Sequence, residues 1–190
     1  MKLKIKIKRL NDLNPLPAII AKGEWVDLRA SQTVTLKAPK ADTLKRITKD
    51  GVMEAYRKVE FDLQYIPLGI AMKLPKGYEA HVLPRSSTAK GFGVLLANSM
   101  GIIDESYSGN TDEWKFPALA IRNTTIKGPE ADDNGNLASG NRICQFRIEL
   151  SQKASMWQKL KWLFTSGIEF IEVDDLGSNA RGGFGSTGKN

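Results

Sequence analysis

Short stretches of alternating apolar and polar residues run along most of the chain. In the first stretch, residues 2–8, Leu3, Ile5 and Ile7 fall on one face and lysines on the other. This is the pattern of a half-buried β-strand whose lysines protect a sheet edge. Similar stretches, bounded by turn-forming residues, predict strands at 25–30, 33–37, 60–66, 68–74, 78–83, 93–97, 116–123, 142–150 and 167–173. About ten short strands at near-regular spacing favour an all-β sandwich or barrel.

Two segments depart from this alternation. In residues 42–59, apolar residues recur at helical spacing around Gly51, which predicts one or two short helices packed on the outside of the barrel. In residues 155–164, apolar residues share one face of a second non-strand segment, and lysines lie opposite them. We expect that apolar face to pack in the core or against another subunit. Its members are Met156, Trp157, Leu160, Leu163 and Phe164.

The domain organisation follows from the same pattern. We expect one β domain over residues 1–176, with insertions near 42–59 and 151–165, because 190 residues suffice for a single well-buried core. Residues 127–140 are polar and rich in Gly, Asp and Asn, which indicates a surface loop. From Gly177 onward Gly and Ser dominate and the periodicity ends, so residues 177–190 are predicted to be a flexible C-terminal arm.

Composition limits the class of protein. An apolar content of 41% and a charged content of 26% are ordinary for a soluble globular protein, and no apolar run is long enough to span a membrane. The single cysteine, Cys144, cannot form an internal disulfide, and residues 1–8 lack the apolar core of a signal peptide, so we expect a cytoplasmic protein. The net charge of +7 suits an anionic partner such as a nucleotide, but no compact basic block with interleaved aromatics predicts direct nucleic-acid binding.

Residues 96–110 contain the residue types most typical of a ligand-binding or catalytic site. Two glycines at 101 and 109 allow tight turns or close approach of the backbone to a ligand. Between them lie a carboxylate, Asp104, and an aromatic hydroxyl, Tyr107. Taken alone, the stretch is typical of a β-hairpin with a polar turn.

The spacing N-x-x-G-x-I-D-x-x-Y-x-G in this stretch resembles the third motif of the trimeric deoxyuridine triphosphatases (dUTPases), which split dUTP into dUMP and pyrophosphate. Four more stretches resemble the other motifs of that family in the same order. They are residues 26–30 (VDLRA), 84–87 (PRSS), 140–145 (GNRICQ) and 182–188 (GGFGSTG). The resemblance implies a distorted jelly roll (β-clip) assembled as a homotrimer with shared active sites. The insertions and the continuation after residue 112 are similar to bacteriophage members.

The resemblance also implies roles for individual residues. Asp104 would orient the water that attacks the α-phosphorus, and Tyr107 would pack on the deoxyribose and exclude a 2′-hydroxyl. Asp27 would hold Mg²⁺ through water, which suits an ion that keeps several waters and few protein ligands. Uracil would be recognised, largely through backbone groups, by Asn98, Gly101, Ile102 and Ile103. The phosphates would be bound by Arg85, Ser86 and Ser87, with Gln145 reaching the ligand from its strand.

The C-terminal arm resembles the family's fifth motif more than a P-loop. Residues 183–189 nearly match the P-loop pattern, but no Ser or Thr follows Lys189 and no helix can follow it. The resemblance implies that Phe184 stacks on uracil and that Gly185, Ser186 and Thr187 wrap the phosphates. The usual arm arginine position is occupied by Asn179, so Arg181 is the candidate for its place.

Other functions are compatible with parts of the sequence. A dCTP deaminase of the same fold also has an Arg-Ser-Ser turn. A dUTPase-like binding or regulatory protein could use the two insertions to hold a partner. A zinc deaminase is excluded, because the chain has no H-x-E with P-C-x-x-C and only one histidine, His81, which we interpret as structural.

Overall fold

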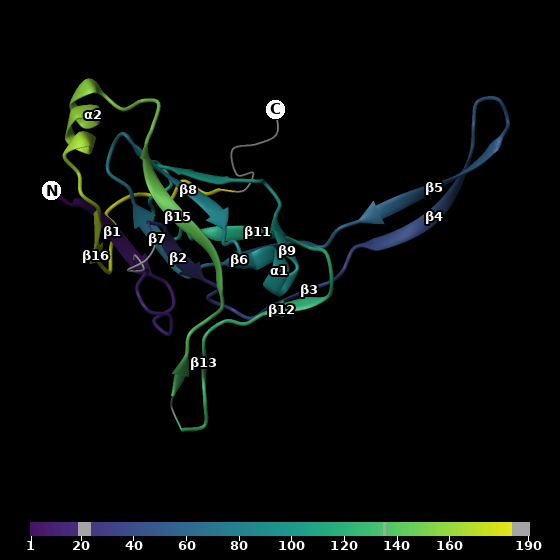
Figure 1. Ribbon diagram of the computed structural model, residues 1–190, viewed down its shortest axis with the longest axis horizontal. Helices are drawn as coiled ribbons and strands as arrows, with labels where there is room; N and C mark the ends of the chain where they lie inside the picture. The colour runs from purple at the N-terminus through teal and green to yellow at the C-terminus, as the bar shows by residue number, and fades with distance from the viewer. Residues whose placement is uncertain (19–23, 135, 184–190) are drawn as a thin grey trace.

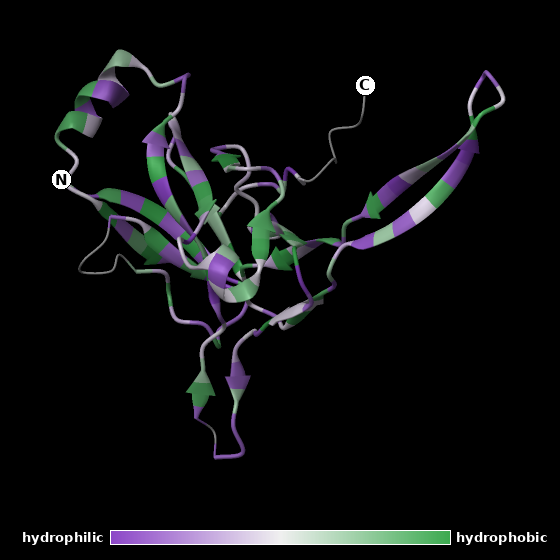
Figure 2. Cartoon of the chain, turned by 45° about the vertical axis from the view of Figure 1, so that its right-hand side comes forward, coloured by the Kyte–Doolittle hydropathy of each residue, from purple (hydrophilic) through white to green (hydrophobic). Residues whose placement is uncertain are grey.

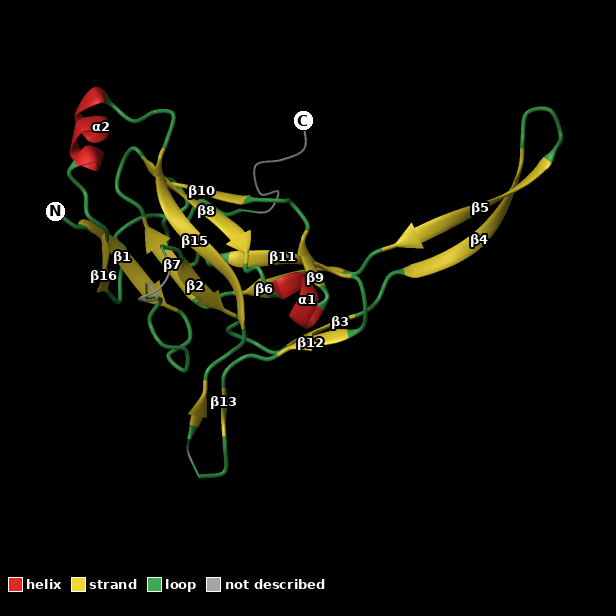
Figure 3. Ribbon diagram, in the orientation of Figure 1, coloured by secondary structure: helices red, strands yellow, loops and turns green. Residues whose placement is uncertain are grey.

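The computed structural model describes residues 1–18, 24–134 and 136–183, and in them strands predominate (Figures 1 and 3). The all-β prediction is confirmed. The first strands are β1 (Leu3–Arg9), β2 (Val26–Arg29), β3 (Val34–Leu36), β4 (Lys40–Ile47), β5 (Met53–Glu60), β6 (Leu63–Pro67), β7 (Ile70–Lys73) and β8 (Tyr78–Pro84). Helix α1 (Thr88–Phe92) follows, and then β9 (Val94–Leu96), β10 (Gly101–Asp104), β11 (Lys115–Ala120), β12 (Thr124–Ile126), β13 (Glu130–Ala131), β14 (Leu137–Ala138), β15 (Arg142–Leu150), α2 (Met156–Leu163) and β16 (Ile168–Glu172).

Three sheets surround one hydrophobic core. The largest has the strand order β10-β8-β15-β2, and two three-stranded sheets have the orders β16-β1-β7 and β6-β11-β9. Their inner faces supply most of the buried residues, and Trp114, just before β11, meets Phe146 edge to face with ring centroids 5.2 Å apart. Because each fully buried aliphatic or aromatic side chain contributes about 1.5–3 kcal/mol, this shared core holds the sheets together.

Strand β15 shows how the alternation of the sequence becomes structure. Cys144, Phe146 and Ile148 are buried, whereas Gln145 on the opposite face is partly exposed, as predicted. A register shift between Arg142 and Cys144 also turns Ile143 into the core. Burial raises the pKa of the Cys144 thiol, so this cysteine is a neutral core residue.

The first strand is not at a sheet edge, which corrects the prediction from its lysines. β1 pairs in parallel with β16 on one side and antiparallel with β7 on the other. Lys4 and Lys6 are exposed and Lys8 is partly exposed because they point away from the core face, not because the strand lacks a neighbour. The parallel partner lies about 160 residues further along the chain, so local sequence could not reveal it.

The helices predicted for residues 42–59 are absent, and β4 and β5 form an antiparallel hairpin instead. Gly51, with φ +77°, lies in the turn that joins the strands, and Leu44 opposite Tyr56 is a cross-strand pair. The apolar residues fall at helical spacing only when both sides of that turn are taken together. Every residue of both strands is exposed, and the hairpin projects away from the sheets (Figure 1) instead of packing on them.

The second non-strand segment is helix α2. Ser155 and Gln158 form a capping box at its start, and Trp162 packs on Tyr78 with ring centroids 5.5 Å apart. The predicted apolar face is exposed, with Trp157 and Leu163 each 77% accessible, so the expectation of core packing is wrong and packing against a subunit stays a prediction. Apolar residues alternate with polar ones along this helix in Figure 2. In the described parts of the chain, neither helix has the length and apolar character needed to cross a membrane.

Removal of the β4–β5 hairpin should leave the body of the protein intact. Replacing residues 41–59 by Asn-Gly joins Lys40 to Glu60, which are paired at the hairpin base, through a two-residue turn. Because no side chain of the hairpin is buried, we expect Tm to change by less than about 4 °C in calorimetry. Ile66→Ala, which truncates a fully buried side chain, should lower Tm further. A larger loss from the hairpin deletion than from Ile66→Ala would contradict this account.

Candidate functional site

The stretch from 96 to 110 forms one wall of a pocket, but not as a hairpin. β9 pairs with β11, whereas β10 pairs with β8 in a different sheet. The strands part at a turn in which Ser99 has φ +62°, and the space beside them becomes a pocket of about 260 Å³. The predicted hairpin is therefore wrong, because β9 and β10 pair with strands of two different sheets and not with each other.

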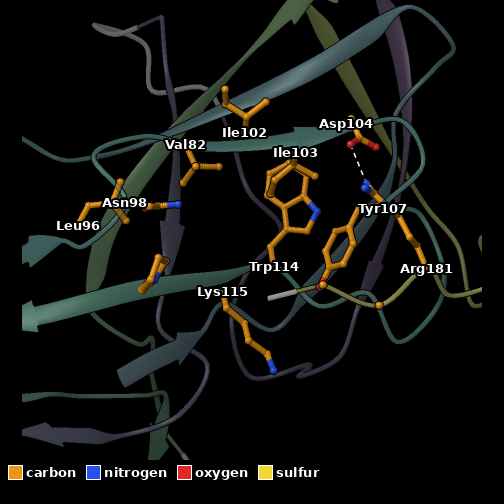
Figure 4. A pocket seen from close by; sticks show the side chains of 14 residues that line it. Val82, Leu96, Asn98, Ile102, Ile103, Asp104, Tyr107, Trp114, Lys115 and Arg181 are labelled. Atoms are coloured by element: carbon orange, nitrogen blue, oxygen red, sulfur yellow. Dashed lines mark hydrogen bonds and ion pairs between the residues drawn. The ribbon is translucent and has the colours of Figure 1, made fainter. Parts of the chain in front are cut away.

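The pocket gathers seven of the residues predicted to bind or transform a ligand (Figure 4). They are Asn98, Gly101, Ile102, Ile103, Asp104, Tyr107 and Arg181. Three more lining residues, Leu96, Gly182 and Gly183, belong to stretches singled out in the sequence but had no individual role, whereas Val82, Trp114, Lys115 and Pro117 were not predicted. Trp114 and Lys115 come a few residues after the motif, and this closeness in sequence is the signal that could have identified them.

Asp104 is held in place by two neighbours at the edge of the pocket. Ser106 donates to one carboxylate oxygen through both its hydroxyl and its backbone N–H, and Arg181 Nη1 lies 2.7 Å from the other oxygen. Desolvation raises the pKa of Asp104, but the Ser106 and Arg181 hydrogen bonds outweigh it and hold the pKa below its ordinary value. The group is thus an oriented carboxylate at neutral pH.

Tyr107 forms a rigid aromatic wall. Its hydroxyl donates to the carbonyl oxygen of Glu113 over 2.9 Å, which fixes the ring. Desolvation, together with the charges of Asp112 and Glu113, raises the pKa of Tyr107. On its other side the ring lies so near Gly183 that a Cβ there would come within 2.9 Å of Cε2. The chain from residue 181 to 183 therefore packs directly against this wall.

A second group of predicted residues lies outside this pocket. Asp27 on β2 forms ion pairs with Arg85 at 2.8 Å and with Arg142 at 3.1 Å, one on each carboxylate oxygen. Arg85 also reaches the Ser87 hydroxyl, at 3.4 Å. Ser86 and Ser87 are exposed, and Gln145 is the register partner of both Leu83 and Asp27. Motif residues that are distant in sequence thus cluster around one carboxylate.

Asp27 is chemically suited to an outer-sphere role toward Mg²⁺. Each of its oxygens accepts one bond from an arginine, and a carboxylate has about four acceptor sites, so capacity remains for a metal-bound water. In the described residues no group of three or more His, Cys, Asp or Glu side chains could hold a metal by itself. The Asp27 carboxylate therefore fits a Mg²⁺ ion whose other ligands are phosphate oxygens and waters.

The predicted contacts of Phe184, Gly185, Ser186 and Thr187 lie outside the described residues and stay predictions. Arg181 is described, and it reaches Asp104 although it lies two positions after Asn179, the usual place of the arm arginine. His81 lies 2.8 Å from Glu79 through Nε2, as expected for a structural histidine.

The sequence comparisons agree with this arrangement. No protein-family model matches the chain. The SPbeta prophage-derived deoxyuridine 5'-triphosphate nucleotidohydrolase YosS of Bacillus subtilis strain 168 is 44% identical over 186 residues, which cover 98% of this chain and 99% of that relative. The deoxyuridine 5'-triphosphate nucleotidohydrolase of Finegoldia magna is 32% identical over 190 residues, covering 97% of this chain and 99% of the relative.

The fold comparison points the same way. A dUTPase crystal structure from Streptococcus mutans superposes with a TM-score of 0.54 at 16% identity, covering 79% of this chain and 98% of the other. That likeness supports the fold alone, whereas the two relatives compared by sequence identify the protein family. The chain belongs to the deoxyuridine 5'-triphosphate nucleotidohydrolase (dUTPase) family.

The contact between Arg181 and Asp104 makes a testable contribution to the pKa of the carboxyl group. Arg181→Gln removes a hydrogen bond and a positive charge that both lower that pKa. The Asp104 pKa should therefore rise toward its ordinary value, as measured by an NMR pH titration of its carboxyl carbon. Arg46→Gln, which breaks a 3.0 Å pair with Glu54 in the β4–β5 hairpin, is the matched control and should leave Asp104 unchanged. An unaltered titration in Arg181→Gln would show that the contact is absent in solution.

Proposed function

We propose that this protein hydrolyses dUTP to dUMP and pyrophosphate through attack of a water on the α-phosphorus. The observation that carries the proposal is the pocket in which Asp104, Tyr107 and the backbone of residues 101–103 meet. The pocket offers a flat ring, backbone polar groups and one oriented carboxylate, which suit a sugar, a small planar base and a water, respectively. Family membership supports the same reaction.

Asp104 is the residue we assign to the water. Cleavage of a phosphoanhydride requires a positioned nucleophile in line with the leaving group, and proton acceptance from that water lowers the barrier. The Ser106 and Arg181 contacts keep the carboxylate ionised and fix its direction. Tyr107 would face the deoxyribose, where its fixed ring leaves no space for a 2′-hydroxyl.

The phosphate-binding residues would come from another copy of the chain. Asp104 is the register partner of Glu79 on β8, whereas Arg85 follows the far end of that strand. Six residues of extended strand span roughly 20 Å, so one chain cannot bring Arg85 to its own Asp104. Sites shared around a closed ring solve this problem, and we propose a homotrimer. Light scattering should give three times the 21.0 kDa chain mass, and a monomeric active enzyme would refute the shared site.

Mg²⁺ is the cofactor we propose, held near Asp27 through water. When bound with the triphosphate, the ion would neutralise phosphate charge. Arg85 and Arg142 already orient the Asp27 carboxylate, and the Ser87 hydroxyl lies 3.4 Å from Arg85. Titrating Mg²⁺ against dUTP turnover tests this cofactor, since activity that survives complete chelation would exclude it.

We also propose that a regulatory protein partner would bind the insertions and not the pocket. The β4–β5 hairpin and the apolar face of α2 are exposed, and none of their residues lines the pocket. Deletion of residues 41–59 should therefore keep dUTP hydrolysis at the wild-type rate. A loss of hydrolysis in a folded deletion variant would show that the hairpin serves the active site.

The decisive experiment compares three substrates, one active-site variant and one control variant. The wild type should release pyrophosphate from dUTP, release far less from UTP, and release no ammonia from dCTP. Asp104→Asn should keep the fold but lower kcat by about 10²–10⁴-fold, the usual contribution of a general base. Asp132→Asn, in the β13–β14 turn, is the matched control because Asp132 also accepts backbone N–H bonds but lies away from the pocket. Ammonia release from dCTP would indicate a deaminase, and a wild-type kcat in Asp104→Asn would remove Asp104 from this role.

A further inference from the structure

Asp112 is a buried carboxylate to which the motif resemblance assigns no role. It is only 2% exposed, at the end of the turn formed by residues 109–112. Its Oδ2 accepts the backbone N–H of Gly109 at 2.8 Å and of Arg181 at 2.9 Å, and its Oδ1 accepts the backbone N–H of Gly182 at 3.0 Å. Two of these donors come from about 70 residues further along the chain. The carboxylate therefore joins a local turn to the C-terminal segment.

Two close glycine contacts show how tightly the same segment is seated. A Cβ at Gly109 would come within 2.3 Å of the Ala180 Cα, and a Cβ at Gly183 would come within 2.9 Å of the Tyr107 ring. Residues 180–183 thus fit between the turn and the aromatic wall of the pocket. Asp112 lies between these two contacts and bonds the backbone at 181 and 182.

We propose that Asp112 is a positioning residue that anchors residues 181–183 of its own chain beside the pocket and thereby places the Arg181 guanidinium against Asp104. The anchoring itself stands on geometry. Its consequence for catalysis rests on the proposed function, because only a nucleotide-hydrolysing pocket needs that guanidinium at its edge.

The chemistry of the carboxylate suits an anchor. Desolvation raises the pKa of Asp112, but the backbone N–H groups of Arg181, Gly109, Gly182 and Ser108 outweigh it and keep the pKa low. An ionised carboxylate makes stronger hydrogen bonds than a neutral acceptor and can serve several donors at once. Asn at this position has nearly the same shape, but its NH₂ group would face a backbone N–H and lose at least one of these bonds.

Limited proteolysis measures the anchoring without any substrate. Trypsin cleaves after Arg181, and the bond between Arg181 and Gly182 must leave its seat to enter the protease. Asp112→Asn should speed formation of the 1–181 fragment, followed by mass spectrometry, at least about tenfold, which corresponds to the loss of one charge-assisted bond. Tm should stay close to that of the wild type, because a role confined to the fold would change Tm and not this one cleavage. Asp132→Asn should cleave at the wild-type rate.

A second variant tests the position of residues 180–183 through their contact with Gly109. Gly109→Ala leaves Asp112 unchanged but places a methyl group against Ala180, so it should also speed cleavage after Arg181. It decides the outcome if Asp112→Asn does not fold. In both variants kcat/KM for dUTP should fall about tenfold or more as Arg181 leaves Asp104.

The possible results separate this proposal from the proposed function. Wild-type cleavage rates in folded Asp112→Asn, or in Gly109→Ala if the first variant fails to fold, would overturn the anchor. Faster cleavage with unchanged kcat/KM would confirm the anchor and overturn its role in catalysis. A wild type that does not hydrolyse dUTP would refute the proposed function, while the cleavage rates would still decide whether Asp112 holds the segment.

Discussion

The antiparallel pairing of β10 with β8 is the constraint on which the rest of the site depends. It places Asp104 opposite Glu79, at one end of β8, and leaves Arg85 at the other end. The same sheet continues through β15 and β2, which carry Gln145 and Asp27 toward the Arg85 end. One four-stranded sheet thus bears two half-sites that face different places. Under the proposed function, a single nucleotide would meet both halves where two copies of the sheet come together.

Each half-site has the same electrostatic design, a carboxylate already held by arginine. Asp104 is paired with Arg181, and Asp27 is paired with both Arg85 and Arg142. An arginine that is pre-oriented by a carboxylate loses less side-chain entropy when an anion arrives. The chain carries a net charge of +7, which favours the approach of a polyphosphate, and under the proposed function the two carboxylates would face a water and a hydrated metal. In each ion pair the arginine can attract an anionic ligand, and the carboxylate is a hydrogen-bond acceptor held in a fixed direction.

Local sequence patterns predict where strands lie and which residues line the pocket. They do not predict which strands or segments these pair with in space. The alternation in residues 142–150 correctly separates Gln145 from the buried residues of β15, since period two depends only on neighbours in sequence. The position of β1 inside a sheet depends on β16, which no local pattern encodes. The apolar residues of 42–59 predict helices but form two strands, because a turn at Gly51 divides them. The motif identified Asp104 and Tyr107, but not Asp112, whose importance appears only when residues 181 and 182 are brought beside it.

The contact at Asp112 also accounts for how Arg181 reaches Asp104 in this chain. The side chain of an arginine is long, but its reach is set by where its own backbone is fastened. Here the backbone at 181 and 182 is fastened directly to Asp112, and Gly109 lets Ala180 lie close enough for that bond to form. From that point the guanidinium spans to Asp104 at 2.7 Å. The two backbone bonds to Asp112 thus set the point from which Arg181 reaches the Asp104 carboxylate.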